Sequence, residues 1–370
     1  MGFVTQTILA AEVIRHFSHP LISLPKRLQF ATSYALKKTE YKNAWIIYQV
    51  SVPHSEPNLN QYSADDGFHT RTLAEIIFSR KPAPKQCINH EPSRQIIALL
   101  KNPNKHLSNK ATLEKHSHLA IILDCYLESG RPRIFRIYHQ PMNSVFTKED
   151  RPIFWLGDVD TGMSFHSLAN LFQKTRYEKL RKQILDALAQ HGQEEMFAKF
   201  VKSIFKPSIC LGLKMEAIQK LGKIKTKTGI KFLVNTAISA SNFMLRKISV
   251  QALSHNHHPL SRKAIRILAL KGNPVEVRKE AIFGLSQIGD EESIYTLGKI
   301  VAQENNPDIK EYAIFAISQL PDNKGKPLLA KLAKLSPNPK IREKAIFWMG
   351  KTDEEKRLDL LIDVINGLDN

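Results

Sequence analysis

The residues of this sequence whose types and spacing could do chemistry are few. Three histidines, His255, His257 and His258, stand within four residues in the stretch SHNHHP, and histidine is a common metal ligand. No cysteine or carboxylate accompanies them in that stretch, so we interpret it as a solvated loop between helices and expect no metal. The pair Asp65–Asp66 lies in a glycine-containing loop and indicates a turn rather than an acid–base pair.

Sequence motifs of catalytic and nucleotide-binding sites are also missing. The sequence contains neither GxxxxGK(S/T) nor GxGxxG, and neither HExxH nor GxSxG. Its three cysteines, Cys87, Cys125 and Cys210, are too sparse for a disulfide framework and lack zinc-ligand spacing. We interpret them as reduced, buried thiols, with a Cys87–Cys125 bridge as the alternative in an exported protein. We therefore predict that the protein is not an enzyme and has no catalytic residue and no cofactor.

The charge of the chain is strongly basic and unevenly distributed. The net charge is +19, which favours an anionic partner such as nucleic acid, an acidic protein surface or anionic lipid. Residues 214–277 contain 12 Lys and Arg but only two Asp and Glu, a net charge of +10. A binding surface for an anionic partner is therefore expected in this part of the chain, with a solvated basic face that binds nothing as the alternative.

The C-terminal part of the sequence repeats with a period of 32 or 33 residues. Basic residues that we call anchors recur at this spacing in front of an apolar pattern: Arg181, Lys214, Arg246, Arg278, Lys310 and Arg342. Apolar or small residues stand one position before each anchor and three, four and seven after it, which is one stripe of an α-helix. The phrase RPIFWLGDVD at 151–160 matches KAIFWMGKTD 193 residues later. We interpret these two segments as parts of the first and the last of seven repeat units.

Each unit has room for a second helix after the first. In EESIYTLGKIVAQ, the residues Ile294, Leu297, Ile300 and Val301 have helical spacing, and prolines in KGNP, ENNPD and LSPNP separate this helix from the next anchor. Helix pairs of this kind bury their apolar faces by stacking on their neighbours. The sequence therefore predicts a mainly α fold, with an α-solenoid of about seven helix pairs over residues 149–370.

The unit VRKEAIFGLSQIGDEESIYTL, residues 277–297, resembles the HEAT family, in particular the HEAT-like repeats of phycobilisome lyases. The resemblance implies a right-handed solenoid whose second helices line the concave face. It also implies that each anchor packs its stem between units and bonds to backbone or to an acidic residue of the preceding turn. Glu276 and Asp308 stand in those places for Arg278 and Lys310. Trp155 and Trp348 lie in the predicted helical stripe and are expected in the core.

Residues 1–148 have a different pattern and predict a small mixed α/β module docked on the first repeat. Amphipathic stretches at about 5–17 and 25–39 predict helices. NAWIIYQVSVP predicts a strand, and HLAIILDCYLESGRPRIFRIYHQ predicts a hairpin with its turn at Ser129–Gly130. A strand-rich module ahead of such an array resembles bacterial HEAT-repeat proteins. The chain has no apolar run long enough to span a membrane, so no membrane insertion is expected. We expect a cytoplasmic protein, or a periplasmic one if the true start carries a signal peptide.

The predicted functional site is a basic patch on the concave face, formed by second helices of the middle repeats. Its residues are Lys199, Lys202, Lys206, Lys227, Lys231, Arg262, Lys263 and Arg266. We predict an interaction scaffold that binds a protein with an acidic surface, and no small-molecule substrate is evident. A nucleic-acid-binding HEAT-like protein is the first alternative. The second is a bilin lyase-like enzyme, which the resemblance to lyase repeats implies.

Overall fold

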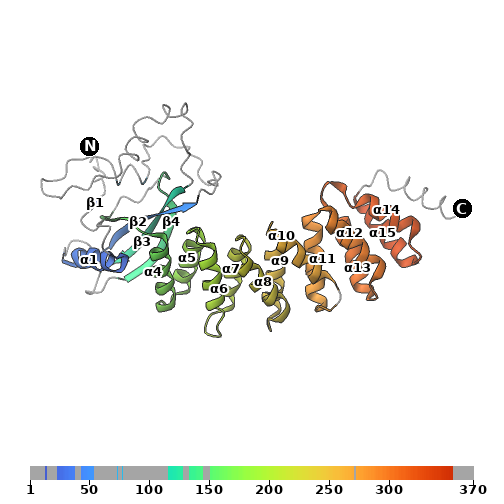
Figure 1. Ribbon diagram of the computed structural model, residues 1–370, viewed down its shortest axis with the longest axis horizontal. Coiled ribbons are helices and arrows are strands. Elements are labelled where there is room, and N and C mark those ends of the chain that lie inside the picture. Colours follow the sequence, from blue (N-terminus) through green and yellow to red (C-terminus); the bar gives the residue numbers. More distant parts are fainter. Residues whose placement is uncertain are drawn as a thin grey trace, which may run out of the picture. The chain divides into compact units, whose positions relative to one another are not determined.

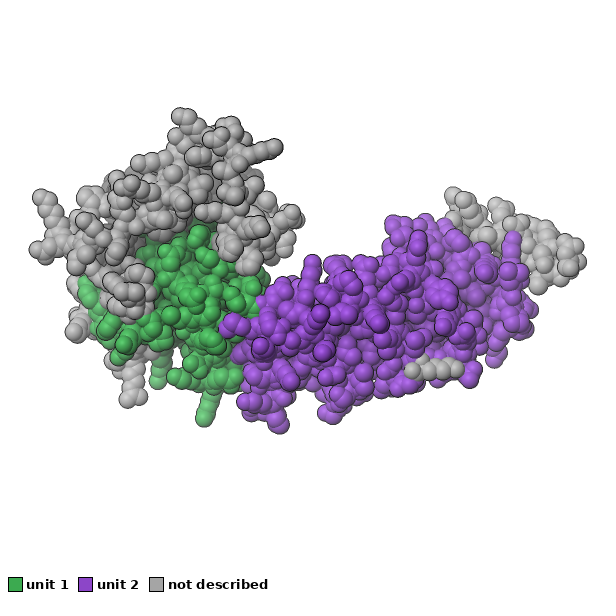
Figure 2. Space-filling model, viewed as in Figure 1, with its two compact units in different colours: residues 1–193 green, residues 194–370 purple. Residues whose placement is uncertain are grey.

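The computed structural model describes residues 13–14, 23–37, 43–53, 73, 77, 116–127, 133–144, 151–270 and 272–352. The chain forms two compact units, residues 1–193 and residues 194–370, shown in Figure 2. We call them unit 1 and unit 2. Unit 1 contains a sheet with helices, and unit 2 contains helices arranged in pairs (Figure 1).

The described part of unit 1 is built on a five-stranded mixed sheet. The strands lie in the order β1-β5-β2-β3-β4. They are β1 (Val13–Ile14), β2 (Asn43–Pro53), β3 (His116–Tyr126), β4 (Arg133–Pro141) and β5 (Ile153–Asp158). Strand β5 runs parallel to β1 and β2, whereas β3 runs antiparallel to both β2 and β4. The predicted strand and hairpin are confirmed, while the turn at Ser129–Gly130 lies outside the described residues.

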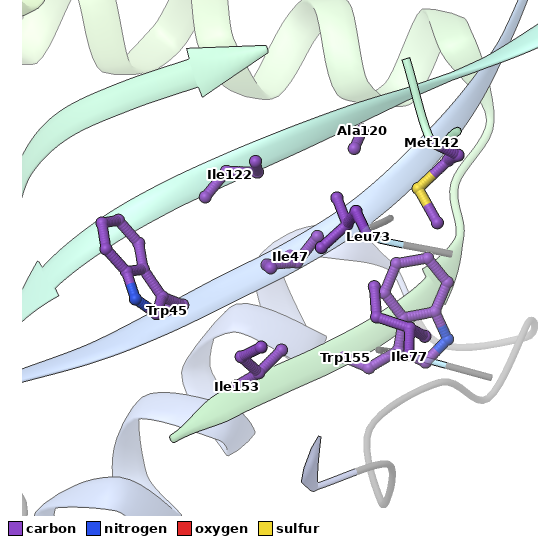
Figure 3. Close-up of a cluster of buried hydrophobic side chains, with 9 residues drawn as sticks. All are labelled: Trp45, Ile47, Leu73, Ile77, Ala120, Ile122, Met142, Ile153 and Trp155. Atoms are coloured by element: carbon purple, nitrogen blue, oxygen red, sulfur yellow. The ribbon is translucent and has the colours of Figure 1, made fainter. Parts of the chain in front are cut away.

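The sheet is covered on both faces, which explains its continuous apolar strands. On one face, alternate residues of β2, β3 and β5 form a buried cluster with Leu73, Ile77 and Met142 (Figure 3). The opposite face contacts helix α1 (Leu24–Lys37) and helix α4 (Thr161–Lys174). Buried Arg27 of α1 donates hydrogen bonds to the carbonyl oxygens of Leu156 and Asp158, each at 2.8 Å. Helix α1 confirms the predicted second amphipathic helix.

The phrase RPIFWLGDVD was expected to be helical, and the structure shows that this interpretation is wrong. Ile153–Asp158 is strand β5, paired with β2 so that Trp45 lies opposite Ile153 and Ile47 opposite Trp155. The first five residues of β5 are all buried, as expected for a strand covered on both faces. The matching phrase near the C-terminus lies mostly in helix α15 (Pro339–Thr352). The helix pairs therefore begin after β5 rather than at residue 149, and the two compact units divide between Gln193 and Glu194.

A second correction concerns the predicted helix at 5–17. Val13 and Ile14 form strand β1, which pairs with β5 in parallel, because a short apolar run can complete a sheet edge as readily as start a helix. The other residues of that stretch lie outside the described residues.

The remaining helices follow the predicted rhythm of pairs. They are α5 (Glu178–Gln190), α6 (Glu194–Ser203), α7 (Leu211–Gly222), α8 (Lys227–Ser239), α9 (Phe243–Ser254), α10 (Pro259–Ala269), α11 (Val275–Ile288), α12 (Glu291–Gln303), α13 (Pro307–Ser318) and α14 (Lys326–Leu335). Each anchor lies on an odd-numbered helix from α5 to α15. In unit 2, each of the first helices α7, α9, α11, α13 and α15 contacts the next (Figure 1). The mainly α fold of helix pairs after a small mixed α/β module is confirmed.

The apolar positions that recur at the same place in each unit form the contacts between successive helix pairs, which we call the seams. Seven positions after the anchor, the residues Leu188, Leu221, Leu253, Leu285 and Ile317 are all 0% exposed. Small residues allow the helices to approach closely. A Cβ atom on Gly222 would lie 2.8 Å from the Cβ atom of Ala252, and one on Gly325 would lie 1.9 Å from the carbonyl oxygen of Ile317.

Candidate partner-binding surface

The arginine anchors have a structural role at the turns between pairs. Each donates a hydrogen bond to a carbonyl oxygen at the end of the preceding helix, where helical carbonyls lack intrahelical partners and the helix dipole is negative. The pairs are Arg181 with Phe172 at 3.2 Å, Arg246 with Ala240 at 2.8 Å, Arg278 with Ala269 at 3.2 Å and Arg342 with Ser336 at 2.8 Å. In the described structure, the lysine anchors Lys214 and Lys310 make no such bond.

The acidic partner of Arg278 differs from the one expected. Arg278 pairs with Glu304, which lies directly after α12, and not with Glu276. Both side chains of the pair are buried. Burial would raise the pKa of Glu304. Hydrogen bonds from the backbone N–H groups of Asn306 and Asn305 and from Arg278 outweigh burial and lower the pKa to about 2. The pair therefore joins the first turn of α11 to the residue directly after α12.

The stretch SHNHHP is held by a residue that the sequence analysis did not single out. Buried Asn256 donates to the carbonyl oxygens of Gly222 and Ile224, at 2.9 and 2.8 Å, and so ties this turn to the preceding pair. His258 is the N-cap of α10, and its Nδ1 accepts a hydrogen bond from the backbone N–H of Leu260. His255 bonds to the carbonyl of Gln251. No group of side chains suited to a metal ion occurs among the described residues.

All eight residues of the predicted basic patch lie on or just after second helices. Lys199 and Lys202 lie on α6, Lys227 and Lys231 on α8, and Lys263 on α10. These lysines are exposed, as is Lys206 after α6. Lys199 forms an ion pair with Glu195 of the same helix at 4.0 Å. The other five lysines have no ion pair within the described parts of the chain.

Arg262 and Arg266 are half-buried and do not have the open position expected of patch residues. Arg262 binds Asp290 at 3.2 Å, and Arg266 binds Glu292 at 2.5 Å. Both acids stand at the start of α12, so these ion pairs bridge α10 to the next second helix. Burial acts to raise the pKa of Asp290, but hydrogen bonds from Ser293 and the two arginine charges lower it. The two arginines are thus neutralised within the array, and the open positive charge belongs to the lysines.

Exposed apolar side chains share the surface with these lysines, and the sequence analysis missed them. Ile238 on α8 is 45% exposed, Ile267 on α10 is 55% exposed, Leu270 directly after α10 is 41% exposed, and Tyr295 on α12 is 72% exposed. The repeat itself could have revealed them. These residues stand 17, 21 or 24 positions after their anchors, where the buried stripe of the second helix does not reach.

Unit 1 contains a buried polar chain that resembles catalytic geometry without the access that catalysis needs. The Tyr48 hydroxyl lies 3.0 Å from Ser164 Oγ, which lies 2.7 Å from His191 Nε2, and His191 Nδ1 donates to the carbonyl of Ala187 at 2.7 Å. A serine hydrogen-bonded to histidine is the arrangement of an activated nucleophile. Here Ser164 and His191 are 0% exposed, so this series of hydrogen bonds serves to join β2, α4 and the end of α5. Burial lowers the pKa of His191 to about 4.

Comparisons with known proteins match one family model and several solved structures. The family model described as HEAT repeats matches residues 263–346 and 296–368. The two matches together span residues 263–368. Several solved structures are similar at low sequence identity. The complex of CpcE and CpcF of phycocyanin lyase from Nostoc sp. PCC7120 is 14% identical, with 41% of this chain and 97% of that chain covered and a TM-score of 0.30.

Human deoxyhypusine hydroxylase in complex with glycerol is 16% identical, with 51% of this chain and 85% of that chain covered and a TM-score of 0.25. Similarity at these TM-scores carries no argument about fold or activity. No curated protein matches the sequence. Among the described residues, none of the helices has the length and apolar character needed to cross a bilayer.

Proposed function

We propose that this protein is a non-enzymatic interaction scaffold that binds a protein with an acidic surface through the second helices α6, α8 and α10. HEAT-repeat arrays generally serve as protein-interaction scaffolds. One observation carries the proposal for this chain. Lys202, Lys206, Lys227, Lys231 and Lys263 are exposed on or next to neighbouring second helices, and none of them has an ion pair among the described residues.

The composition of helices α8 and α10 distinguishes this surface from an ordinary solvated face. Helices α8 and α10 contain no Asp or Glu, and α8 contacts α10. Unpaired like charges on adjacent helices repel one another and reduce the stability of the array. A bound acidic surface would neutralise them and would also release small counterions.

The experiment reverses the charge on this surface and measures binding of a labelled poly-L-glutamate probe to the full chain. Lys227→Glu, Lys231→Glu and Lys263→Glu are combined in one variant. The control variant reverses three exposed lysines elsewhere, Lys179, Lys324 and Lys340. We expect the first variant to bind the probe at least about tenfold more weakly than the wild type and the control to bind nearly as well. Equal losses in both variants, or no binding by the wild type at low salt, would overturn the proposal.

Nucleic acid is the second candidate, because residues 214–277 carry a net charge of +10. A duplex DNA probe in the same assay separates the candidates. Binding to phosphates weakens steeply as salt rises, in proportion to the number of contacts. Tighter binding of DNA than of poly-L-glutamate would favour this candidate. The bilin lyase-like alternative stays a prediction, and nothing in the described residues supports it.

A further inference from the structure

The second helices of unit 2 carry a repeated outer stripe. It consists of the residues 17, 21 and 24 positions after the anchors of four successive units. On α8 these are Lys231, Asn235 and Ile238, on α10 Lys263, Ile267 and Leu270, on α12 Tyr295, Lys299 and Ala302, and on α14 Pro327, Lys331 and Lys334. All twelve side chains are exposed. Positions with these spacings share one face of a helix, so the stripe is a surface rather than a set of isolated positions.

The four helices that carry the outer stripe are neighbours in order. Helix α8 contacts α10. The ion pairs of Arg262 and Arg266 join α10 to the start of α12. A Cβ atom on Gly298 of α12 would lie 3.5 Å from a methyl carbon of Leu328 on α14. The rows of the stripe therefore continue from one helix to the next across the array.

The apolar members of the stripe are not needed for the core of their own helices. On α10, the buried side chains are Ser261, Ile265, Leu268 and Ala269, which face the neighbouring helices. Ile267 and Leu270 lie on the other side of the same helix and are about half exposed. Single exposed apolar residues are common. Ile238, Ile267, Leu270 and Tyr295 all lie at positions of the outer stripe on three successive second helices, and together they form a patch of the kind that marks a protein contact.

The charges around the patch define the chemistry of the partner. The outer stripe contains five lysines and no acidic residue, and none of these lysines has an ion pair among the described residues. Aliphatic side chains contribute little to binding nucleic acid, whose phosphates and bases are met by cationic, polar and aromatic groups. An apolar centre with a charged rim is the usual structure of a protein interface.

We propose that the outer stripe binds an acidic amphipathic segment of another protein, with its apolar side chains against Ile238, Ile267 and Leu270 and its carboxylates against the lysines. This inference rests on the proposed function and adds to it the apolar contact and the form of the partner. Packed helices lie about 8–10 Å apart, so a segment that crosses α8, α10 and α12 covers about 20 Å. A helix of about 14 residues has that length.

The test uses the full chain and two labelled synthetic peptides of the same composition. One peptide is an 18-residue helix with leucine on one face and glutamate on the other, and the second has the same residues in an order that breaks the apolar face. We expect the wild type to bind the amphipathic peptide at least about tenfold more tightly than the scrambled one. The double variant Ile267→Ser/Leu270→Ser should bind both peptides equally and should bind poly-L-glutamate as the wild type does.

A matched control variant changes exposed aliphatic residues outside the stripe. Leu211→Ser/Val275→Ser removes side chains that are 38% and 39% exposed at the starts of two first helices, and it should keep the preference for the amphipathic peptide. Equal binding of the two peptides by the wild type, or loss of the preference in this control, would overturn the inference while leaving the proposed function standing. Failure to bind either peptide or poly-L-glutamate would overturn both. Tighter binding of duplex DNA than of the amphipathic peptide would also overturn both, in favour of nucleic acid.

Discussion

The buried polar residues of this protein act as fixed connections between elements. Arg278 and Glu304 are buried as a pair, Asn256 reaches across to the preceding helix pair, and His191 closes a hydrogen-bonded chain in unit 1. Buried charges and amides are tolerated only when their hydrogen bonds are satisfied. Each of these residues should therefore be costly to change by itself.

Removing one member of the Arg278–Glu304 pair should destabilise unit 2 strongly. Arg278→Ala leaves the Glu304 carboxylate buried without its cationic partner, and we expect a loss of about 3–5 kcal/mol in the free energy of unfolding. The double variant Arg278→Met/Glu304→Met should recover most of that loss, because no charge stays buried. Urea denaturation followed by circular dichroism measures both. A single variant as stable as the wild type would contradict this account of the pair.

His191 should make the stability of unit 1 depend on pH. Its pKa is about 4 in the folded protein, against 6.5 for an ordinary histidine, and its surroundings are Tyr48, Ser164, the Ala187 carbonyl and His139. Between these values only the unfolded chain binds the proton, so stability is complete above about pH 6.5 and falls as the pH is lowered toward 4. We expect a loss of about 2 kcal/mol between about pH 7.5 and pH 5.

The chain contains three tryptophans, which allow this loss to be measured. In a Trp348→Phe background, Trp45 and Trp155 report on unit 1 alone during denaturation. His191→Gln should remove most of the pH dependence, whereas His255→Gln, at an exposed histidine, should keep it. An unchanged pH dependence in His191→Gln would rule out this histidine as the source.

At the scale of elements, two glycines of the array should respond in opposite ways to the same substitution. Gly325→Ala places a Cβ atom 1.9 Å from the Ile317 carbonyl oxygen. Helices α13 and α14 would have to move apart, at a cost of about 1–3 kcal/mol. Gly298→Ala places its Cβ atom in ordinary contact, 3.5 Å from Leu328. It should stabilise the protein by about 0.5–1 kcal/mol through helix propensity. Thermal denaturation of both variants checks the signs, and destabilisation by Gly298→Ala would count against the packing of α12 on α14 described above.

The sequence predicts the seams of the array well because they depend on local periodicity. Leu221, Leu253 and Leu285 occupy one column and are all fully buried. Strand β5 could not be predicted in this way. Its apolar run suits a helix or a strand, and the pairing of Trp45 with Ile153 decides between them, although more than 100 residues separate the two. The anchors were found from their spacing, but the partner of Arg278 was not, because Glu304 lies across a whole helix pair.

For the candidate site, the repeat in the sequence predicts on which helices the residues lie but not which side chains they contact. All eight residues lie on or after second helices, as their place in the repeat requires. The pairing of Arg262 and Arg266 with α12 acids depends on how successive pairs stack, which charge counts along the chain do not reveal. Exposed Ile267 and Leu270 were missed because apolar residues on an amphipathic helix are expected to face inward.

For the whole molecule, the concentration of positive charge should affect stability as well as binding. Repulsion among the unpaired lysines of α8 and α10 is screened by salt. We expect the free energy of unfolding to rise by about 0.5–1 kcal/mol between low and moderate salt. The Lys227→Glu/Lys231→Glu/Lys263→Glu variant should show a smaller rise, since its charges are mixed. Denaturant titrations at two sodium chloride concentrations measure both, and an equal rise in the two proteins would show that these lysines do not repel one another appreciably.

Each additional unit of 32 residues adds one second helix, and with it three more residues, to the outer stripe. The reach of the surface is therefore set by how many units the chain contains and grows in whole steps of about 8–10 Å, the distance between packed helices. Duplication of the segment from α9 to α10 would add one such set of three residues without altering the sets on the neighbouring helices. Chains with more or fewer units would then suit longer or shorter partner segments through the same few side-chain types.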